Sequence, residues 1–225
     1  LGAFSGVTYS GAVEQSGDIT LNSKQPAFGG GSPVTISGDI SGVSTAGGIF
    51  TFGSGNYILT GTNTWTGPTR IVQGSTVQTA SGDAIPDDVT LQIHESSTLE
   101  LAGFDETIGG LEDFGTLGSS IALGTNILTV AGNSNSRFTG VISGSGGLLK
   151  TGTGTLTLNG TSTFTGTTTV SAGTLGGSGT LPGTVSIASG GTLAPGNSPG
   201  ILNTGNLNID GELLIDIAGD DIPGA

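Results

Sequence analysis

An internal repeat of about a hundred residues constrains the fold of this chain more than any other sequence feature. When the chain is shifted by 99 residues, residues 55–67 lie over residues 154–166, and Trp65 lies over Phe164. Turn glycines and apolar positions coincide in the two copies, and residues 36–42 match 138–144 after a three-residue slip. Self-similarity of this kind is typical of architectures in which each unit stacks on the next.

Within each copy, short alternating strands are followed by Gly, Asn or Ser turns, as in residues 155–158 and 184–187. Strict alternation of polar and apolar residues predicts strands with one buried face. A β-sandwich or barrel and a β-solenoid share this texture. The solenoid is favoured because the strands are shorter than the usual length of about 5–6 residues. Matching Thr, Ser and Asn positions would also form ladders between stacked rungs. We therefore predict an all-β parallel β-helix (β-solenoid) with roughly 20 residues per rung.

The repeat predicts how one continuous solenoid is divided. Residues 1–34 form atypical N-terminal rungs or a cap, 35–134 form the first repeat unit, and 135–225 form the second unit with trailing rungs. Residues 1–7 and 211–217 read as apolar strand-like segments without a polar cap. Because solenoid ends are normally capped, we expect either that the native chain continues or that copies stack end to end.

Composition excludes several classes of protein. Glycine supplies 45 of 225 residues, but a mean hydropathy of +0.18 argues against a disordered linker. Lys24, Arg70, Arg137 and Lys150 are the four cations against 17 acidic residues, a net charge of −13. Scattered cations exclude nucleic-acid binding and polybasic attachment to membranes. The chain has no cysteine, hence no disulfide or thiolate metal site, and no apolar run of 18 residues that would span a bilayer.

Residues 146–158, 163–170 and 172–175 strongly resemble the passenger-associated transport repeat of bacterial autotransporters. Residues 191–200 resemble the segment that follows these repeats in large passenger domains, and the resemblance covers roughly residues 35–217. It implies a right-handed parallel β-helix that is displayed or secreted outside a Gram-negative-type cell. Family members serve as adhesins, autoaggregation factors or carriers of enzymatic heads, so an extracellular or cell-surface location is expected.

His94 is the single histidine of the chain. No nucleophile elbow lies near it, so a Ser-His-Asp triad is not indicated, and a solvent-facing or laddered polar side chain is favoured. A glycosidase needs two carboxylates about 5–10 Å apart. A lyase also needs a base, and neither Arg70 nor Lys150 is expected near the acids. The candidate carboxylates are Asp83, Asp87, Asp88, Glu95, Glu100, Asp105, Glu106, Glu112 and Asp113.

A structural role is favoured for these acids over weak calcium binding or catalysis, and the calcium-binding nonapeptide pattern does not occur. Trp65 is interpreted as a packing residue at a rung corner, with a sugar-stacking platform as the alternative. The glycine-rich stretches lack the Gly-Lys-Thr ending of a phosphate loop. The sequence thus predicts no catalytic, cofactor-binding or metal-binding residues, no cofactor, and no enzyme.

Three functions remain. The first is a structural, adhesin-like segment of a bacterial surface or secreted protein, which serves as a stalk, in display or in adhesion to cells or surfaces. Its expected partners are surface glycans, other cells, or a second copy through open strand edges. The second is a subunit of an extracellular filament formed by end-to-end stacking, and the third is a polysaccharide lyase or hydrolase on a β-helix.

Overall fold

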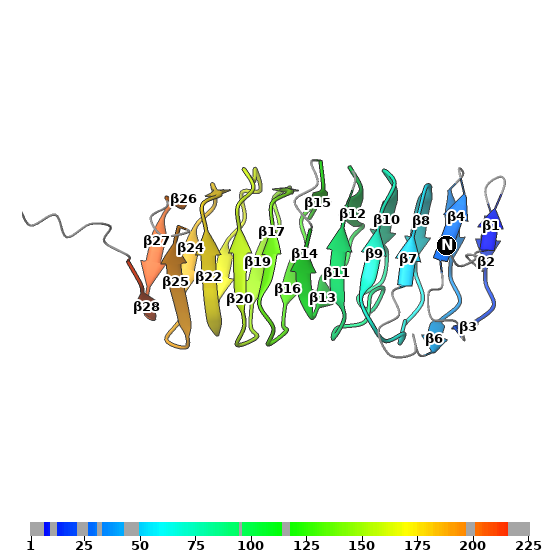
Figure 1. Cartoon of the computed structure of the whole chain (residues 1–225), viewed down its shortest axis with the longest axis horizontal. Helices are drawn as coiled ribbons and strands as arrows, with labels where there is room; N and C mark the ends of the chain where they lie inside the picture. The colour runs from blue at the N-terminus through cyan, green and yellow to red at the C-terminus, as the bar shows by residue number, and fades with distance from the viewer. Residues whose placement is uncertain are drawn as a thin grey trace, which may run out of the picture.

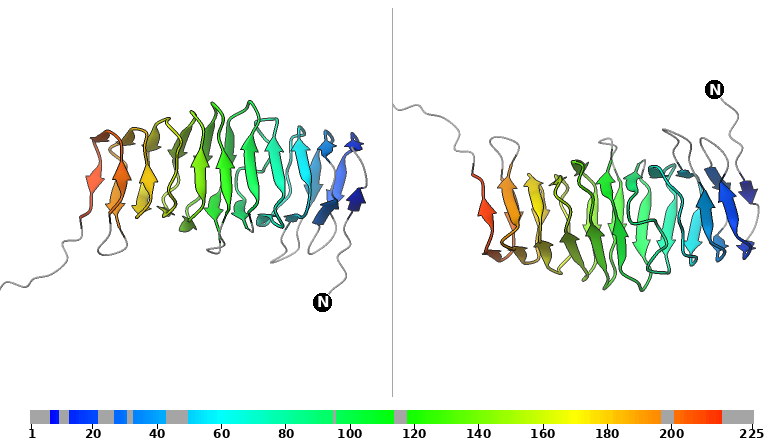
Figure 2. Two further views of the ribbon diagram at one scale, coloured as in Figure 1. Left: turned by 90° about the horizontal axis from the view of Figure 1, so that it is seen from above. Right: turned by 90° about the horizontal axis from the view of Figure 1, so that it is seen from below.

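The computed structural model describes residues 7–9, 13–21, 27–30, 33–42, 50–94, 96–113, 118–196 and 201–215. In it the chain winds as a right-handed parallel β-helix, a rod with the first strands at one end and the last at the other (Figures 1 and 2). Strand neighbours pair in parallel, for example β10 with β12 and β16 with β19. The predicted all-β solenoid is confirmed, and the antiparallel sandwich alternative is wrong.

The strands form three faces that run along the rod. The first face begins as a six-stranded sheet and continues beyond it, because β14 contacts β17. Its strands are β1 (Val7–Tyr9), β4 (Ala27–Gly30), β7 (Phe50–Phe52), β9 (Thr69–Ile71), β11 (Thr90–Ile93), β14 (Gly110–Glu112), β17 (Ser136–Phe138), β20 (Thr155–Leu158), β22 (Gly173–Gly177), β25 (Gly191–Pro195) and β28 (Glu212–Leu213).

Each of the other two faces is interrupted once. The second face comprises β2 (Val13–Gln15), β5 (Val34–Ile36), β8 (Asn56–Leu59), β10 (Thr76–Thr79), β12 (Thr98–Leu101), β15 (Ser120–Ala122) and β18 (Val141–Ser143), and then β23 (Thr180–Leu181) and β26 (Asn203–Thr204). The third face comprises β3 (Ile19–Leu21) and β6 (Ile40–Gly42), and then β13 (Glu106–Ile108), β16 (Ile127–Val130), β19 (Gly147–Lys150), β21 (Thr168–Val170), β24 (Val185–Ile187) and β27 (Leu207–Ile209).

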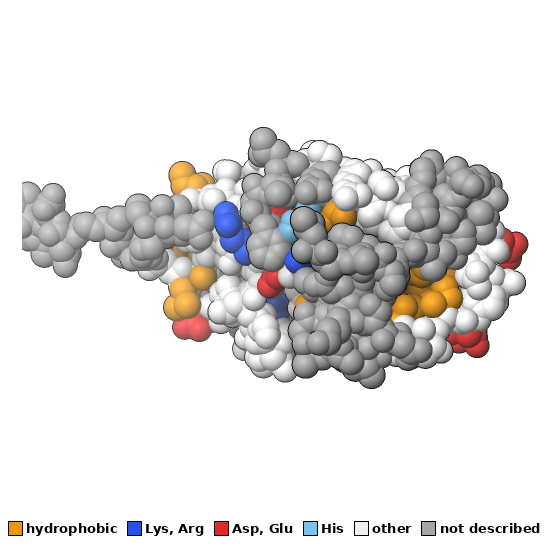
Figure 3. Space-filling model, turned by 45° about the vertical axis from the view of Figure 1, so that its right-hand side comes forward, with side chains coloured by type: hydrophobic (Ala, Val, Ile, Leu, Met, Phe, Trp, Pro, Cys, Tyr) orange, Lys and Arg blue, Asp and Glu red, His pale blue; other side chains and the backbone are white. Residues whose placement is uncertain are grey.

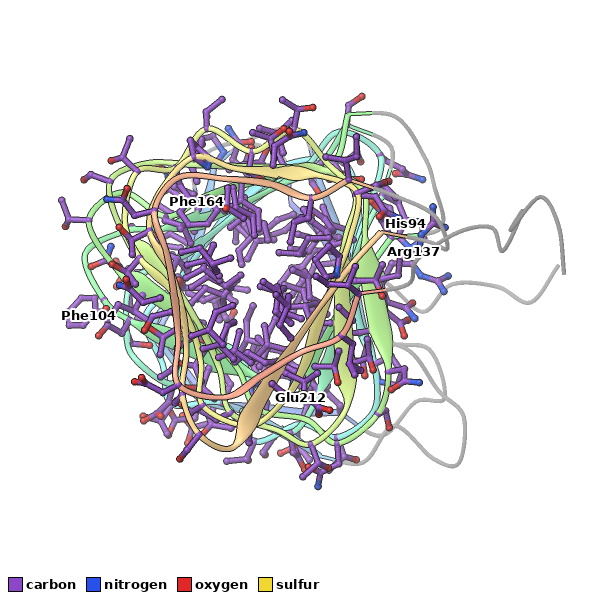
Figure 4. The ribbon with its side chains drawn as sticks, turned by 90° about the vertical axis from the view of Figure 1, so that its left-hand side faces the viewer. His94, Phe104, Arg137, Phe164 and Glu212 are labelled. Atoms are coloured by element: carbon purple, nitrogen blue, oxygen red, sulfur yellow. The ribbon has the colours of Figure 1, made fainter. Side chains whose placement is uncertain are left out.

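The polar and apolar residues that alternate in the sequence face outward and inward, respectively, in the strands. In β20, Leu156 and Leu158 are buried while Thr155 and Thr157 lie on the outer surface, because successive residues of a strand point to opposite sides. Apolar side chains from the three faces form one buried core, and in the view along the axis many side chains point inward (Figure 4). Each fully buried Leu, Ile or Val stabilises the rod by about 1.5–3 kcal/mol.

A cluster of aromatic rings lies in the core of the N-terminal half. Phe52 lies 5.8 Å from Phe28, 5.2 Å from Tyr57 and 6.3 Å from Trp65, measured between ring centroids. These separations fall in the range of favourable ring pairs. The cluster therefore ties together rungs that are up to 37 residues apart (28 to 65).

One turn of the helix takes a variable number of residues. Paired strands are offset by 17 residues from Thr168 to Val185 and by 24 from Phe28 to Phe52. The expected rung of roughly 20 residues is therefore an average, and 99 residues need not make a whole number of turns.

The two sequence copies accordingly occupy different faces. Strand β8 of the first copy belongs to the second face, whereas β20, its counterpart in the second copy, belongs to the first face. Likewise β9 lies on the first face and its counterpart β21 on the third. The repeat is thus rotated by one face around the axis, which a three-sided solenoid permits because each face offers a similar strand site.

The close stacking of turns from successive rungs requires glycine at some positions. A Cβ atom on Gly152 would lie only 1.9 Å from the carbonyl oxygen of Gly132, one rung below.

The division of the chain at residues 34 and 134 stays a prediction. Where they are described, β1, β2 and β3 pair in parallel with β4, β5 and β6.

Candidate functional site

Each repeat copy contains a corner at which an aromatic side chain is buried between exposed threonines. Trp65 and Phe164 are both fully buried, whereas Thr64 and Thr163 beside them are exposed. The indole Nε1 of Trp65 donates to Thr69 Oγ1 at 2.7 Å. Trp65 is therefore a packing residue, as the sequence predicted, and its ring is not available to stack on a sugar.

Both corners bind the preceding rung in the same way. Asn63 Oδ1 accepts the Ile40 N–H at 2.7 Å, and Ser162 Oγ accepts the Ile142 N–H at 3.3 Å. Asn63 also donates to the carbonyl of Ala84 on the following rung at 2.8 Å. Side-chain and backbone hydrogen bonds together thus join the rungs where each corner interrupts its face: the third face in the first copy and the second face in the second copy.

An acidic hollow of about 410 Å³ lies beside the first corner. Desolvation, followed by the charges of Asp83 and Asp88, raises the pKa of Asp87. Three of the predicted acids are therefore together, yet no group of three or more His, Asp or Glu side chains suited to a metal ion occurs within the described ranges. The hollow is lined by Thr62, Asn63, Thr64, Trp65, Thr66, Asp83, Pro86, Asp87 and Asp88.

Glu106 lies inside the rod rather than on its surface. Its side chain is buried, and Oε1 accepts the Ile85 N–H at 3.3 Å. Burial raises the pKa of Glu106 to about 9, the Ile85 N–H opposes this shift, and the charges of Asp87 and Asp83 add to it. Glu106 is therefore a neutral carboxylic acid at pH 7.

A polar column crosses the outside of the first face through Arg70, Gln92, Glu112 and Arg137. Arg70 donates to Gln92 Oε1 at 3.0 and 3.3 Å, and Gln92 Nε2 donates to Glu112 Oε2 at 3.1 Å. Strand β17 carries Arg137 next to β14, where the Asp113 N–H donates to the Arg137 carbonyl at 3.0 Å. Figure 3 shows basic, acidic and histidine side chains close together on one side of the rod. The register stacks Arg70 two rungs from Glu112, with Gln92 between them.

A polar groove of about 310 Å³ opens beside this column. It combines carboxylate, amide, hydroxyl and guanidinium groups from consecutive rungs. No predicted feature indicated it, because its residues are spread over 46 positions of sequence (112 to 157). The groove is lined by Glu112, Asp113, Asn135, Ser136, Arg137 and Thr157.

The remaining candidates are dispersed. His94 lies on the same side as Arg137, but its side chain is buried rather than solvent-facing (Figure 4). Lys150 is buried in the third face, where burial lowers its pKa and its Nζ donates to the Gly152 carbonyl. Glu100 accepts a hydrogen bond from Gln78 Nε2 at 2.8 Å.

Of the other candidate acids, Asp105 accepts the Ile127 N–H at 2.7 Å and so joins two rungs. Glu95 lies outside the described residues. The described part of the chain contains no helix long and apolar enough to cross a membrane.

Comparison with known proteins agrees with this geometry. The passenger-associated-transport-repeat family matches residues 52–78 and 148–176, which contain the two aromatic corners. The chain is 34% identical over 127 residues, or 56% of its length, to the adhesin BmaC autotransporter of Brucella suis biovar 1 (strain 1330). It spans 4% of that relative's length. No solved structure matches the chain significantly.

These matches agree with the predicted location outside or on the surface of a Gram-negative-type cell. They also agree with the fold, since the repeat units form the stacked rungs described above. The chain is therefore a parallel β-helix that carries two passenger-associated transport repeats, and it is similar over part of its length to an autotransporter adhesin.

Proposed function

We propose that the chain is a structural, adhesin-like segment of a bacterial surface protein, which extends and presents its outer faces to other cells or surfaces. The proposal is supported by the similarity to an autotransporter adhesin and by the two transport repeats. The observation that carries it is the stacking of parallel strands around a sealed apolar core, with polar columns outside.

This construction suits adhesion for a physical reason. Rungs repeat about every 4.8 Å along the axis, so a rigid rod holds its outward side chains at fixed intervals. Individually weak contacts made by such an array add up when many rods act together. Other cells and surface glycans are the proposed partners, and a net charge of −13 disfavours nucleic acid.

A surface-display experiment tests this function. The chain is displayed on a non-adherent bacterium, and binding to host cells, abiotic surfaces and sister cells is counted against cells that carry the display anchor alone. The proposal expects increased attachment in proportion to the number of displayed rods. Equal attachment by both strains, with the rod detected at the surface, would remove the adhesive role.

The two alternatives predict other outcomes. End-to-end filaments, which no contact among the described residues favours, would elongate in electron micrographs of the purified chain as its concentration rises. A lyase or hydrolase would cleave acidic polysaccharides and lose turnover when Asp87 and Asp88, which lie together in the acidic hollow, are replaced by alanine.

A further inference from the structure

The polar groove on the first face is built from fixed acceptors. Glu112 Oε2 accepts from Gln92, and Asp113 Oδ2 accepts from the N–H and the hydroxyl of Thr139 at 2.8 and 2.7 Å. Asn135 Oδ1 accepts the Thr155 N–H at 2.9 Å, which leaves the amide NH₂ as its donor end. Because these hydrogen bonds hold the side chains in the free protein, a ligand would lose little free energy in ordering them.

Arg137 supplies an uncommitted donor in the same groove. Its side chain is exposed and, among the described residues, makes no side-chain hydrogen bond or ion pair. In the same groove, Glu112 Oε2 and Asp113 Oδ2 accept from Gln92 and Thr139. A guanidinium offers five N–H donors in a planar fork, which suits neighbouring oxygen atoms of one ligand.

The charge balance of the groove selects the ligand class. Two carboxylates and one guanidinium give the groove a net charge of −1. The carboxylates repel an anionic polymer, and the guanidinium of Arg137 repels a polycation. A neutral polyhydroxyl chain avoids both costs, because each hydroxyl donates to a carboxylate and accepts from the guanidinium or the Asn135 amide. A chain that lies along the axis would meet Glu112, Arg137 and Thr157 on three successive rungs.

From these observations we propose that the groove beside Arg137 binds a neutral polysaccharide chain lying along the rod axis. This inference rests on the proposed adhesive function and names the partner for one face. The groove has no aromatic side chain among its lining residues, so a single site is weak, with a Kd on the order of 1 mM. Attachment would come from many rods acting together.

Titration of the isotope-labelled chain, followed by its amide NMR signals, tests the proposal. The probes are three neutral hexasaccharides (cellohexaose, maltohexaose and laminarihexaose), an anionic hexagalacturonate and a cationic glucosamine hexamer. We expect saturable shifts at the groove for at least one neutral probe. Arg137→Ala should weaken that binding at least about tenfold, because it removes hydrogen bonds from a charged donor.

The matched control is Glu100→Gln on the second face, compared with Glu112→Gln in the groove. Glu100 pairs with Gln78 as Glu112 pairs with Gln92, so both changes have similar structural effects. Only Glu112→Gln should weaken binding. Stronger binding of a charged probe, no saturable binding of a neutral one, or unchanged binding by Arg137→Ala would each overturn the inference.

Attachment of cells that display the rod distinguishes a wrong groove from a wrong adhesive function. If cells that display the Arg137→Ala rod attach as well as those with the unchanged rod, the groove is not the contact surface and the adhesive function stands. If cells that display the unchanged rod do not attach at all, the adhesive function itself is lost.

Discussion

Replacement of Gly152 by alanine should force two rungs of the helix apart. A Cβ atom at this position would lie 1.9 Å from the Gly132 carbonyl oxygen and 2.3 Å from the Ala131 carbonyl oxygen. Both contacts are far shorter than real Cβ contacts, which stay above 3.0 Å. Since both oxygens belong to backbone, no side-chain rotation relieves them, and the rungs must separate by about 1 Å.

The cost follows from what that separation disturbs. Overpacking against a rigid neighbour costs about 1–3 kcal/mol. The adjacent Thr151 N–H donates to the Val130 carbonyl at 3.1 Å, and stretching this bond loses up to about 1 kcal/mol more. Gly152→Ala is therefore expected to lower the free energy of unfolding by about 3 kcal/mol.

Gly82→Ala is the matched control. Its Cβ would lie 3.7 Å from the Asp105 carbonyl oxygen, an ordinary contact, and Gly82 is exposed without a left-handed backbone. Restricting the unfolded chain should therefore stabilise this variant by about 0.4–1 kcal/mol.

Urea unfolding followed by circular dichroism compares the two variants, with hydrogen exchange to locate the loss. Local exchange is needed because solenoids do not always unfold in one step. Gly152→Ala should lower the midpoint and speed exchange in the rungs around residues 130–155. Equal midpoints for the two variants would refute the stacking of the Gly152 turn on the rung below.

Three further predictions, on five variants, concern the interior and the corners. The pKa of Glu106 is raised to about 9, so the folded state keeps this proton above pH 4.5, where the unfolded state loses it. The free energy of unfolding therefore falls as the pH rises from about 4.5 to about 9. Glu106→Gln should flatten that fall in thermal melts measured from pH 4 to 9, and an unchanged slope would contradict a buried neutral acid. Trp65→Ala and Phe164→Ala should each cost about 3–5 kcal/mol in urea unfolding, and a loss below about 1 kcal/mol would contradict their burial. Asn63→Ala should cost more than Ser162→Ala, because Asn63 bonds the rungs on both sides, and equal losses would exclude the two-sided role.

The sequence predicted the features that depend on local pattern. The alternation in residues 155–158 specified which side of β20 is buried, and the equivalence of Trp65 and Phe164 specified two packed corners. Short strands with Gly and Asn turns were sufficient to favour the solenoid, because the same periodicity recurs in every rung.

Features that depend on the length of each turn could not be predicted. Turns of 17 to 24 residues rotate the second copy by one face and place Arg70 in one column with Glu112. A difference of a few residues in a turn leaves the strand pattern unchanged and carries no signal of its own. Glu106 and Lys150 were misleading for another reason: the charged residue type suggests a surface site, but the strand alternation turns both inward.

Distances along one outward column test the solenoid most directly, and the absence of cysteine makes site-specific spin labelling simple. Thr107, Thr169, Ser186 and Asn208 occupy one column of the third face, at zero, three, four and five rungs. Pulsed electron paramagnetic resonance between a label at 107 and one at each other position should give about 14, 19 and 24 Å, a rise of about 4.8 Å per rung. Distances that do not increase with rung number would contradict the parallel β-helix.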